Sequence, residues 1–156
     1  MCATALAEVK DRPVLLILTG EDCADAVKAA FNYAQSSSKR LHVLQILTSN
    51  LYHYGHHDLI TTRPTKRQFL LYIRDEVLKR GKTEVRALEK KAGDMGISLE
   101  VNSVESEDIY LTALSEAKKG YDSVFLPKGR KKLFPLFKKN LAQYLRKKIT
   151  GKTVPC

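Results

Sequence analysis

The sequence predicts an α/β fold in which a doubly wound, mostly parallel five-stranded sheet carries helices on both faces. Short apolar runs alternate along the chain with longer stretches whose apolar residues recur every three or four positions. Several of the apolar runs are nearly continuous, as is typical of strands buried on both faces. A sheet of such strands is expected to be parallel and joined by right-handed crossovers.

The first half of the predicted fold begins with VLLILT at 14–19, a strand that Gly20 ends. Residues 21–35 are predicted to form a helix, because alanines recur at helical spacing and acids occupy the first turn, where the helix dipole favours them. The second strand is LHVLQIL at 41–47. Residues 48–64 show no periodicity and are expected to be the longest irregular stretch.

A long helix is predicted at about 65–92, with Gly93 and Gly96 marking its end. The residues expected on its apolar face step by three or four and are Phe69, Tyr72, Ile73, Val77, Gly81, Val85, Leu88 and Ala92. ISLEVNSV at 97–104 is the third predicted strand.

A helix at 106–120 follows, with Ser106 as its expected N-cap and Gly120 at its close. DSVFLP at 122–127 is the fourth predicted strand, and residues 153–156 form at most a stub of a fifth.

The last predicted helix runs from the stretch PKGRKKLFPLFKKN, at 127–140, to about Ile149. Pro135 is tolerable in its first turn. Its apolar face is expected to consist of Phe134, Phe137, Leu141, Tyr144, Leu145 and Ile149. We expect one domain over residues 1–156, with residues 1–11 as a flexible N-terminus.

The net charge of +10 lies entirely in the last part of the chain. Residues 1–122 carry 17 Lys and Arg against 17 Asp and Glu, whereas residues 123–156 carry ten and none. This basic C-terminal face can be a solvated surface, or it can bind an anionic ligand, an acidic membrane leaflet or a protein partner. No specific nucleic acid is predicted, because no recognition motif is present and Phe134 and Phe137 fall on the expected core face.

The cysteines and histidines do not predict a metal site. The cysteines are Cys2, Cys23 and Cys156; their number is odd and no C-x-x-C pair exists, so neither a disulfide framework nor a zinc site is suggested. A helix N-terminus lowers the pKa of a thiol, but the acids around Cys23 act against this and favour an unreactive thiol. The spacing of His53, His56 and His57 fixes no known coordination geometry, so we expect them to pack within their loop. No apolar run is long enough for a transmembrane segment, and the chain is expected to be cytoplasmic.

No catalytic motif is present, and we expect no enzymatic activity. The sequence lacks G-x-S-x-G, H-E-x-x-H, a P-loop and the dinucleotide-binding glycine fingerprint. Acids and hydroxyls occur at strand ends, but the sequence alone places no Ser/His/Asp set, so no catalytic residue is predicted.

Two segments carry a resemblance to a known family. One is AGDMGISLEVNSVESEDIYLTALSEAKKGYDSVFLPKGR, at 92–130, and the other is RPVLLILTGEDCADAVKAAFNYA, at 12–34. In their order of strand, turn and helix these segments resemble the universal stress proteins, and the similarity covers nearly the whole chain. The resemblance implies a Rossmann-like fold of the adenine-nucleotide alpha-hydrolase type, a role in stress response, and a homodimer that many members form through the last strand. Because Pro155 removes a ladder donor there, we expect a shorter strand contact or a contact between helices.

The ATP-binding branch of that family carries G-x2-G-x9-G-[ST] after its fourth strand, where glycine amides close on the phosphates. If Gly129 is the second glycine, Leu126 stands at the first, and Lys139 and Asn140 replace the final pair. The branch also has an Asp at the end of its first strand, where this chain has Thr19. The positions of the family's nucleotide site are then Thr19, Gly20, Lys128, Gly129, Arg130, Lys139 and Asn140.

Because this set is degenerate, the resemblance implies a regulatory or interaction module that does not bind ATP in the family manner and needs no cofactor. The alternative is a switch that binds ATP, AMP or phosphate through the basic loop at 127–132, in which Lys and Arg side chains replace the glycine amides.

Overall fold

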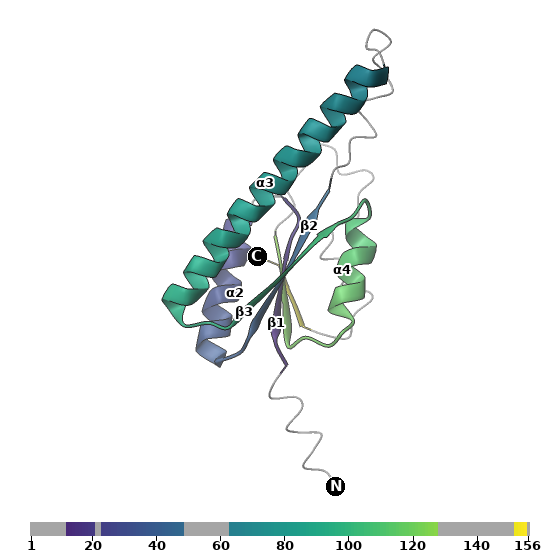
Figure 1. The fold of residues 1–156 in the computed structure, drawn as a ribbon. Coiled ribbons are helices and arrows are strands. Elements are labelled where there is room, and N and C mark those ends of the chain that lie inside the picture. The colour runs from purple at the N-terminus through teal and green to yellow at the C-terminus, as the bar shows by residue number, and fades with distance from the viewer. Residues whose placement is uncertain (1–11, 21–22, 49–62, 128–151, 156) are drawn as a thin grey trace.

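The structure is a computed structural model that describes residues 12–20, 23–48, 63–127 and 152–155. Its centre is a five-stranded sheet in the order β3-β2-β1-β4-β5, in which every pair of neighbouring strands is parallel (Figure 1). The strands are β1 (Val14–Leu18), β2 (Leu41–Leu47), β3 (Leu99–Glu105), β4 (Ser123–Leu126) and β5 (Lys152–Pro155). The described helices are α2 (Ala24–Ser37), α3 (Arg63–Met95) and α4 (Ile109–Ala117).

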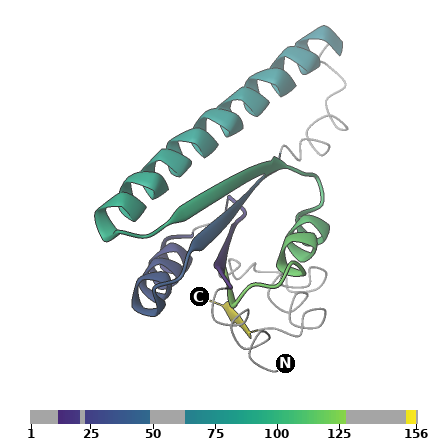
Figure 2. The ribbon, with the colours of Figure 1, turned by 60° about the horizontal axis from the view of Figure 1, so that its bottom comes forward.

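Helices cover both faces of the sheet, as the sequence predicts. The chain moves outward from β1 to β2 and β3, and then returns to β4 on the other side of β1. Because parallel crossovers are right-handed, this reversal sets α2 and α3 on one face and α4 on the other. Figure 2, turned from the first view, shows the same separation of α4 from α2 and α3.

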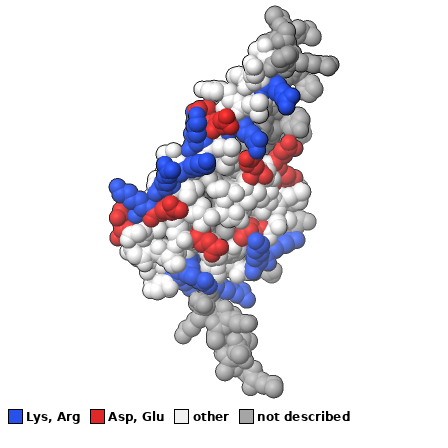
Figure 3. Space-filling view, viewed as in Figure 1, with Lys and Arg blue, Asp and Glu red and all other residues white. Residues whose placement is uncertain are grey.

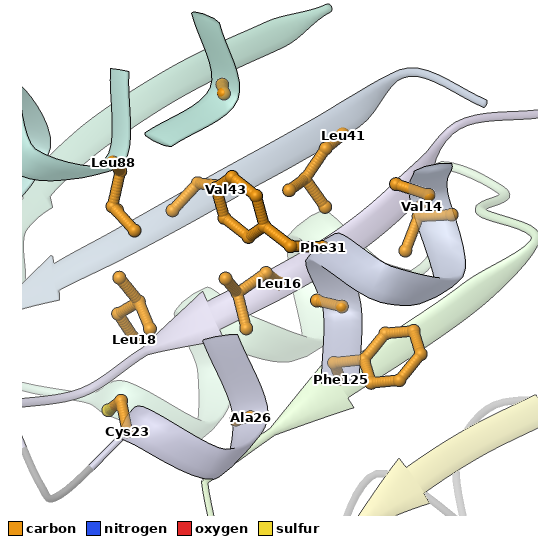
Figure 4. Close-up of a cluster of buried hydrophobic side chains, with 13 residues drawn as sticks. Val14, Leu16, Leu18, Cys23, Ala26, Phe31, Leu41, Val43, Leu88 and Phe125 are labelled. Carbon is orange, nitrogen blue, oxygen red and sulfur yellow. The ribbon is translucent and has the colours of Figure 1, made fainter. Parts of the chain in front are cut away.

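The central strand β1 is buried on both faces, which explains its unbroken apolar sequence. Val14, Leu16 and Leu18 pack with Phe31 of α2 in one apolar cluster (Figure 4), which Leu88 and Ala92 of α3 complete. Leu15 and Ile17 point the other way and pack with Ala113, Leu114 and Ala117 of α4. The side chains of a strand alternate between faces, so a strand with a helix layer on each side must be apolar throughout.

Helices α2 and α3 end in the same way, with a residue in the left-handed conformation. Gly96, at φ 67°, follows α3, and the Ile97 amide donates to the Ala92 carbonyl at 2.9 Å. Ser38, at φ 54°, takes the same place after α2. Of the two glycines predicted to end α3, only Gly96 does so. Gly93 lies within the helix, because the terminating hydrogen bonds need the left-handed residue after Met95.

The N-cap of α4 is Asp108, and the prediction of Ser106 is wrong. The Asp108 carboxylate accepts a hydrogen bond from the Leu111 amide at 3.0 Å, and the helix begins at Ile109. Ser106 lies two residues before this cap, and its Oγ accepts a hydrogen bond from the Asp108 amide at 3.2 Å. The helix also ends at Ala117, earlier than predicted.

The apolar face predicted for α3 is only partly buried. Gly81, Leu88 and Ala92 are buried as expected, but Phe69 is 48% exposed and Tyr72 is 60% exposed. Figures 1 and 2 give the reason, because the first half of α3 extends beyond the carboxyl ends of the strands. The periodicity of the sequence therefore identifies the helix correctly, although the sheet beneath it ends before the helix does.

The predicted fifth strand is present as β5, which pairs in parallel with β4 at the edge of the sheet. Pro155 lies in this strand, and an edge strand is where a sheet tolerates proline. The helix predicted from the basic stretch to Ile149 lies outside the described residues, as do residues 1–11. Among the helices that the structure describes, none is long and apolar enough to cross a membrane.

Candidate functional site

The carboxyl edge of the sheet, between β1 and β4, is the expected place for a ligand. The strand order reverses there, because β1 leads to β2 on one side and the chain later returns to β4 on the other. In open parallel sheets, ligands bind outside the carboxyl ends of the strands at such a switch point. Leu16 pairs with Phe125, so the two strands end side by side.

Thr19 and Gly20 follow β1 directly at this edge. Thr19 is half-buried, and Gly20 adopts φ 76°, in the left-handed region that glycine tolerates without strain. A β-carbon added to Gly20 would meet no atom within 4 Å, so it is the backbone conformation that requires glycine here. Gly20 therefore follows the end of β1 as predicted, and Thr19 presents a hydroxyl where the ATP-binding branch has a carboxylate.

Leu126 and Pro127 end β4 on the other side of the switch point. Leu126 is completely buried and packs in the cluster beneath α4, and Pro127 is buried as well. Leu126 is the residue at the position of the first motif glycine. It is a core side chain, and Pro127 has no amide hydrogen to offer a phosphate.

The remaining predicted site residues lie outside the described part of the chain. These are Lys128, Gly129, Arg130, Lys139 and Asn140, together with the histidines at 53, 56 and 57. Within the described ranges, no group of three or more His, Cys, Asp or Glu side chains could hold a metal ion. Cys23 is buried and stands at the N-cap position of α2.

A second polar group lies at the same edge, where β3 leads into α4. Ser106 Oγ accepts a hydrogen bond from Thr112 Oγ1 at 2.7 Å, and Thr112 Oγ1 also lies 2.9 Å from the Asp108 carbonyl. The Ser106 amide donates to the carbonyl of Leu47, which ends β2, at 3.1 Å. The described hydrogen bonds of both hydroxyls are made within the turn that begins α4, so these contacts stabilise the start of the helix.

The amino edge of the sheet holds a cluster of ionisable side chains that the sequence did not predict. His42 of β2 lies 3.4 Å from the Tyr121 hydroxyl through Nδ1 and 3.1 Å from Glu100 through Nε2, the latter a close approach without hydrogen-bond geometry. Tyr121 donates in turn to Glu116. The pairing of β2 with β3 sets His42 opposite Glu100, and Tyr121 and Glu116 reach the same place from the segment before β4 and from α4.

Charge and burial oppose each other in this cluster. Burial raises the pKa of Tyr121 and its hydrogen bond to Glu116 raises it further, so the phenol stays protonated. Burial would also raise the pKa of Glu116, but hydrogen bonds from Lys119 and Tyr121 hold that pKa below its ordinary value. The cluster lies at the opposite edge from the switch point and ties α4 to the sheet.

Comparisons with known proteins agree with this architecture. No protein-family model and no curated protein matches the sequence. Among solved structures, universal stress protein UspA from Lactobacillus plantarum is similar with a TM-score of 0.67 at 16% identity, over 93% of this chain and 97% of that one. A universal stress protein family member from Burkholderia pseudomallei gives a TM-score of 0.65 at 15% identity, over 94% and 96% of the two chains.

A third similar structure contains a nucleotide. It is a universal stress protein family protein from Arabidopsis thaliana with AMP bound, with a TM-score of 0.52 at 13% identity, over 92% of this chain and 90% of that one. All three structures cover at least nine tenths of this chain, so the similarity extends over the whole sheet and its helices. The architecture of this chain is therefore that of the universal stress proteins.

Proposed function

We propose that this protein is a regulatory or interaction module of the stress response that does not bind ATP through a glycine-rich loop. The fold supports the general class, because its neighbours are universal stress proteins. The sequence and the geometry at the switch point support the absence of the glycine-rich loop with which the ATP-binding branch holds the phosphates. The role is one of binding and not of catalysis, since the described hydroxyls and acids at the carboxyl edge form turns and helix caps.

The observation that carries this proposal is the position of Leu126. A phosphate-binding glycine offers a bare backbone that can approach the ligand closely. Leu126 instead has its side chain completely buried with Leu15 and Ile17 of β1. This residue serves the core, and Pro127 after it lacks an amide hydrogen.

Thr19 supports the same conclusion on the other side of the switch point. The hydroxyl of Thr19 carries no charge, whereas the ATP-binding branch has a carboxylate there that contacts the nucleotide. In this chain the nearest acids are Glu21 and Asp22, two and three residues further on. Carboxylates beside a polyphosphate would repel it, which lowers the affinity for ATP more than for an uncharged ligand.

The alternative is a switch that binds AMP, ATP or inorganic phosphate through Lys128, Arg130 and the neighbouring lysines. Two observations favour it. The similar Arabidopsis thaliana protein was solved with AMP bound. The turn at Gly20 also adopts the left-handed conformation, and among the described residues no atom lies within 4 Å of a β-carbon added there. In this alternative, side-chain charge replaces the missing backbone amides.

Isothermal titration calorimetry with ATP, AMP and inorganic phosphate separates the two functions. The proposal predicts no binding of ATP tighter than about 1 mM, the weak end of the affinity scale. Native mass spectrometry of freshly purified protein should likewise show no retained adenine nucleotide. Micromolar ATP or AMP binding that is lost in the double variant Lys128→Ala/Arg130→Ala, but kept in Lys82→Ala/Lys90→Ala on the exposed surface of α3, would establish the switch instead.

A further inference from the structure

The two edges of the sheet differ in how well they are protected against pairing with another strand. β5 forms one edge and has four residues, among them Lys152 and Pro155. A short edge strand with lysine and proline resists the addition of a further strand. β3 forms the other edge and has seven residues, with neither proline nor lysine (Figure 2). It pairs with β2 residue by residue from Leu99 to Glu105, so it contains no protective bulge.

The hydrogen bonds between β2 and β3 show which backbone groups of β3 face outward. The Leu41 amide donates to the Ser98 carbonyl at 2.9 Å, and the Ser106 amide donates to the Leu47 carbonyl at 3.1 Å. In a parallel ladder, alternate residues direct their N–H and C=O groups to the same neighbouring strand. The even-numbered residues from Ser98 to Ser106 therefore bond to β2. The odd-numbered residues present their backbone groups to the free edge, where no described residue bonds to them, and are Leu99, Val101, Ser103 and Glu105.

The two faces of β3 differ in chemistry. Leu99 and Val101 point toward α3, and both are half-buried against the apolar cluster on that side. Glu100 points to the opposite face, and its side chain is 72% exposed. Side chains of neighbouring strands in a sheet alternate together. A strand added beside β3 would therefore meet apolar side chains on one face and a carboxylate on the other.

The flank of α3 above this edge is also partly apolar. Glu84 faces the middle of the sheet, because its carboxylate bonds to β2. Val85 is turned by about 100° from Glu84, and Leu78, about two turns earlier, lies on the same flank. Both side chains are half-buried. Arg74 lies one turn before Leu78 and pairs with Glu105, so this flank of the helix lies on the side of β3.

The segment around β3 is acidic although the whole protein is basic. Residues 97–117 carry five carboxylates and no lysine or arginine, whereas the chain has a net charge of +10. Glu105 is paired with Arg74 at 3.1 Å, but Glu100 and Glu107 are exposed. In Figure 3 the surface between α3 and the lower end of the sheet is white and red, and the blue side chains lie on α3 and at that lower end. Basic side chains on an added strand would complement this charge.

We propose that the free edge of β3 is a docking site for an extended segment of a partner protein in which apolar residues alternate with lysine or arginine. The backbone of the segment bonds to the four outward-facing residues of β3, as in other cases of strand addition to a sheet edge. Its apolar side chains pack beneath α3, and its basic side chains lie near Glu100. The inference goes beyond the proposed function, because β2 separates this edge from the switch point and a nucleotide titration does not test it.

Fluorescence anisotropy with synthetic peptides that span the seven residues of β3 tests the proposal on the full chain. The probe peptide alternates valine with lysine. One control peptide has the same composition with all its lysines at one end, and a second has glutamate in place of lysine. The probe should bind with a Kd of about 10–500 μM, and each control peptide should bind at least ~10-fold more weakly.

A charge reversal on the protein tests the role of Glu100. Glu100→Lys should weaken binding of the lysine peptide by at least ~5-fold and strengthen binding of the glutamate peptide. Asp25→Lys is the matched control, since it makes the same change in net charge at an exposed carboxylate of α2 and should keep the wild-type preference. Circular dichroism confirms that both variants are folded. If both variants lost the probe equally, net charge and not this edge would explain the binding, and the proposal would fail.

Amide hydrogen exchange measured by NMR tests the backbone geometry. In the free protein, the amides of Val101 and Ser103 should exchange at least ~10-fold faster than those of Asn102 and Val104, which bond to β2. A saturating concentration of the probe should slow the first pair at least ~10-fold and leave the second pair unchanged. Outward amides that are already protected in the free protein would show that the chain covers its own edge. Protection by the probe in β5 instead of β3, or no binding at about 1 mM, would likewise overturn the proposal.

Discussion

The carboxamide nitrogen of Gln45 in β2 donates a hydrogen bond to the carbonyl oxygen of Gly81 in α3 at 3.1 Å. The same nitrogen lies 2.6 Å from Glu84 Oε2, and the Gln45 oxygen accepts from Ser103 Oγ at 2.8 Å. Gln45 is 2% exposed. One buried amide therefore joins α3 to β2 and β3 at the point where the helix leaves the sheet.

Changing Gln45 to Glu should destabilise the protein by about 3 kcal/mol at pH 7, because the substitution places a buried carboxylate against Glu84 and a carbonyl oxygen. Urea unfolding followed by circular dichroism measures the change. Burial raises the pKa of the new carboxyl group above the ordinary Glu value of about 4.3, so the loss should shrink as the pH falls from 7 and should largely vanish near about pH 4. Gln35→Glu is the control, since the hydrogen bond from Gln35 to the Met95 carbonyl is exposed, and it should cost less than about 0.5 kcal/mol. Equal losses in the two variants would show that burial of Gln45 is unimportant.

Two glycines of α3 should respond in opposite ways to a larger residue. Gly93→Ala should raise the free energy of unfolding by about 0.5–1 kcal/mol, because the position is exposed, helical and free of neighbours within 4 Å. Gly81→Leu should lower it by about 2 kcal/mol or more, because a β-carbon alone already comes within 3.0 Å of Leu47 and 3.3 Å of Gln45. Thermal unfolding compares the two variants, and a stabilising Gly81→Leu would show that α3 does not pack closely on β2.

The carboxylate of Asp122 should make the protein sensitive to acid. Burial would raise the pKa of Asp122, but hydrogen bonds from Lys39 and Tyr33 hold that pKa below its ordinary value of 3.8. Lys39 Nζ lies 2.6 Å from Oδ1, and the Tyr33 hydroxyl donates to Oδ2 at 2.7 Å. A depressed folded-state pKa stabilises the protein above the unfolded-state pKa, and this contribution is lost as the pH falls through the folded value.

The variant Asp122→Asn should therefore lose roughly 1–2 kcal/mol near pH 7 and show a flatter decline below about pH 4 than the wild type. Urea unfolding at a series of pH values between about 2 and 7 measures both effects. Asp25→Asn, at an exposed carboxylate in the first turn of α2, is the control and should retain the wild-type dependence. If the free energy of unfolding declined equally at low pH in Asp122→Asn and in the wild type, Asp122 would not be a source of the acid sensitivity.

The left-handed residues that end α2 and α3 give a matched pair of substitutions. Ser38 holds φ 54° without being glycine, so Ser38→Gly should stabilise the protein by about 1 kcal/mol and raise Tm by about 3 °C. Gly96→Ala forces the opposite change at φ 67° and should destabilise it by about 1 kcal/mol. Differential scanning calorimetry measures both. Shifts of the same sign would show that backbone strain does not decide the stability of these helix ends.

Much of the architecture follows from local patterns. The strand at 41–47 has the bounds that its apolar run predicts, and Gly96 ends α3 because only a residue tolerant of positive φ fits there. The sequence predicts the N-cap at Ser106 and not at Asp108, because both residue types are good caps and the sequence alone does not show which amide each side chain reaches. The sequence also places Leu126 where the motif of the ATP-binding branch has its first glycine, and the structure shows that its side chain is completely buried.

The sequence by itself determined the order of strands and helices, since hydrophobic periodicity is a local property of each segment. It also determined the uneven charge of the chain and the absence of a G-x2-G-x9-G-[ST] pattern. Only the tertiary structure decided which apolar residues are buried. Leu88 and Phe69 belong to the same helix and the same periodic pattern, yet the first lies over the sheet and the second beyond its end. The physical reason is that burial depends on what lies opposite a side chain, and strands far away in sequence supply that surface.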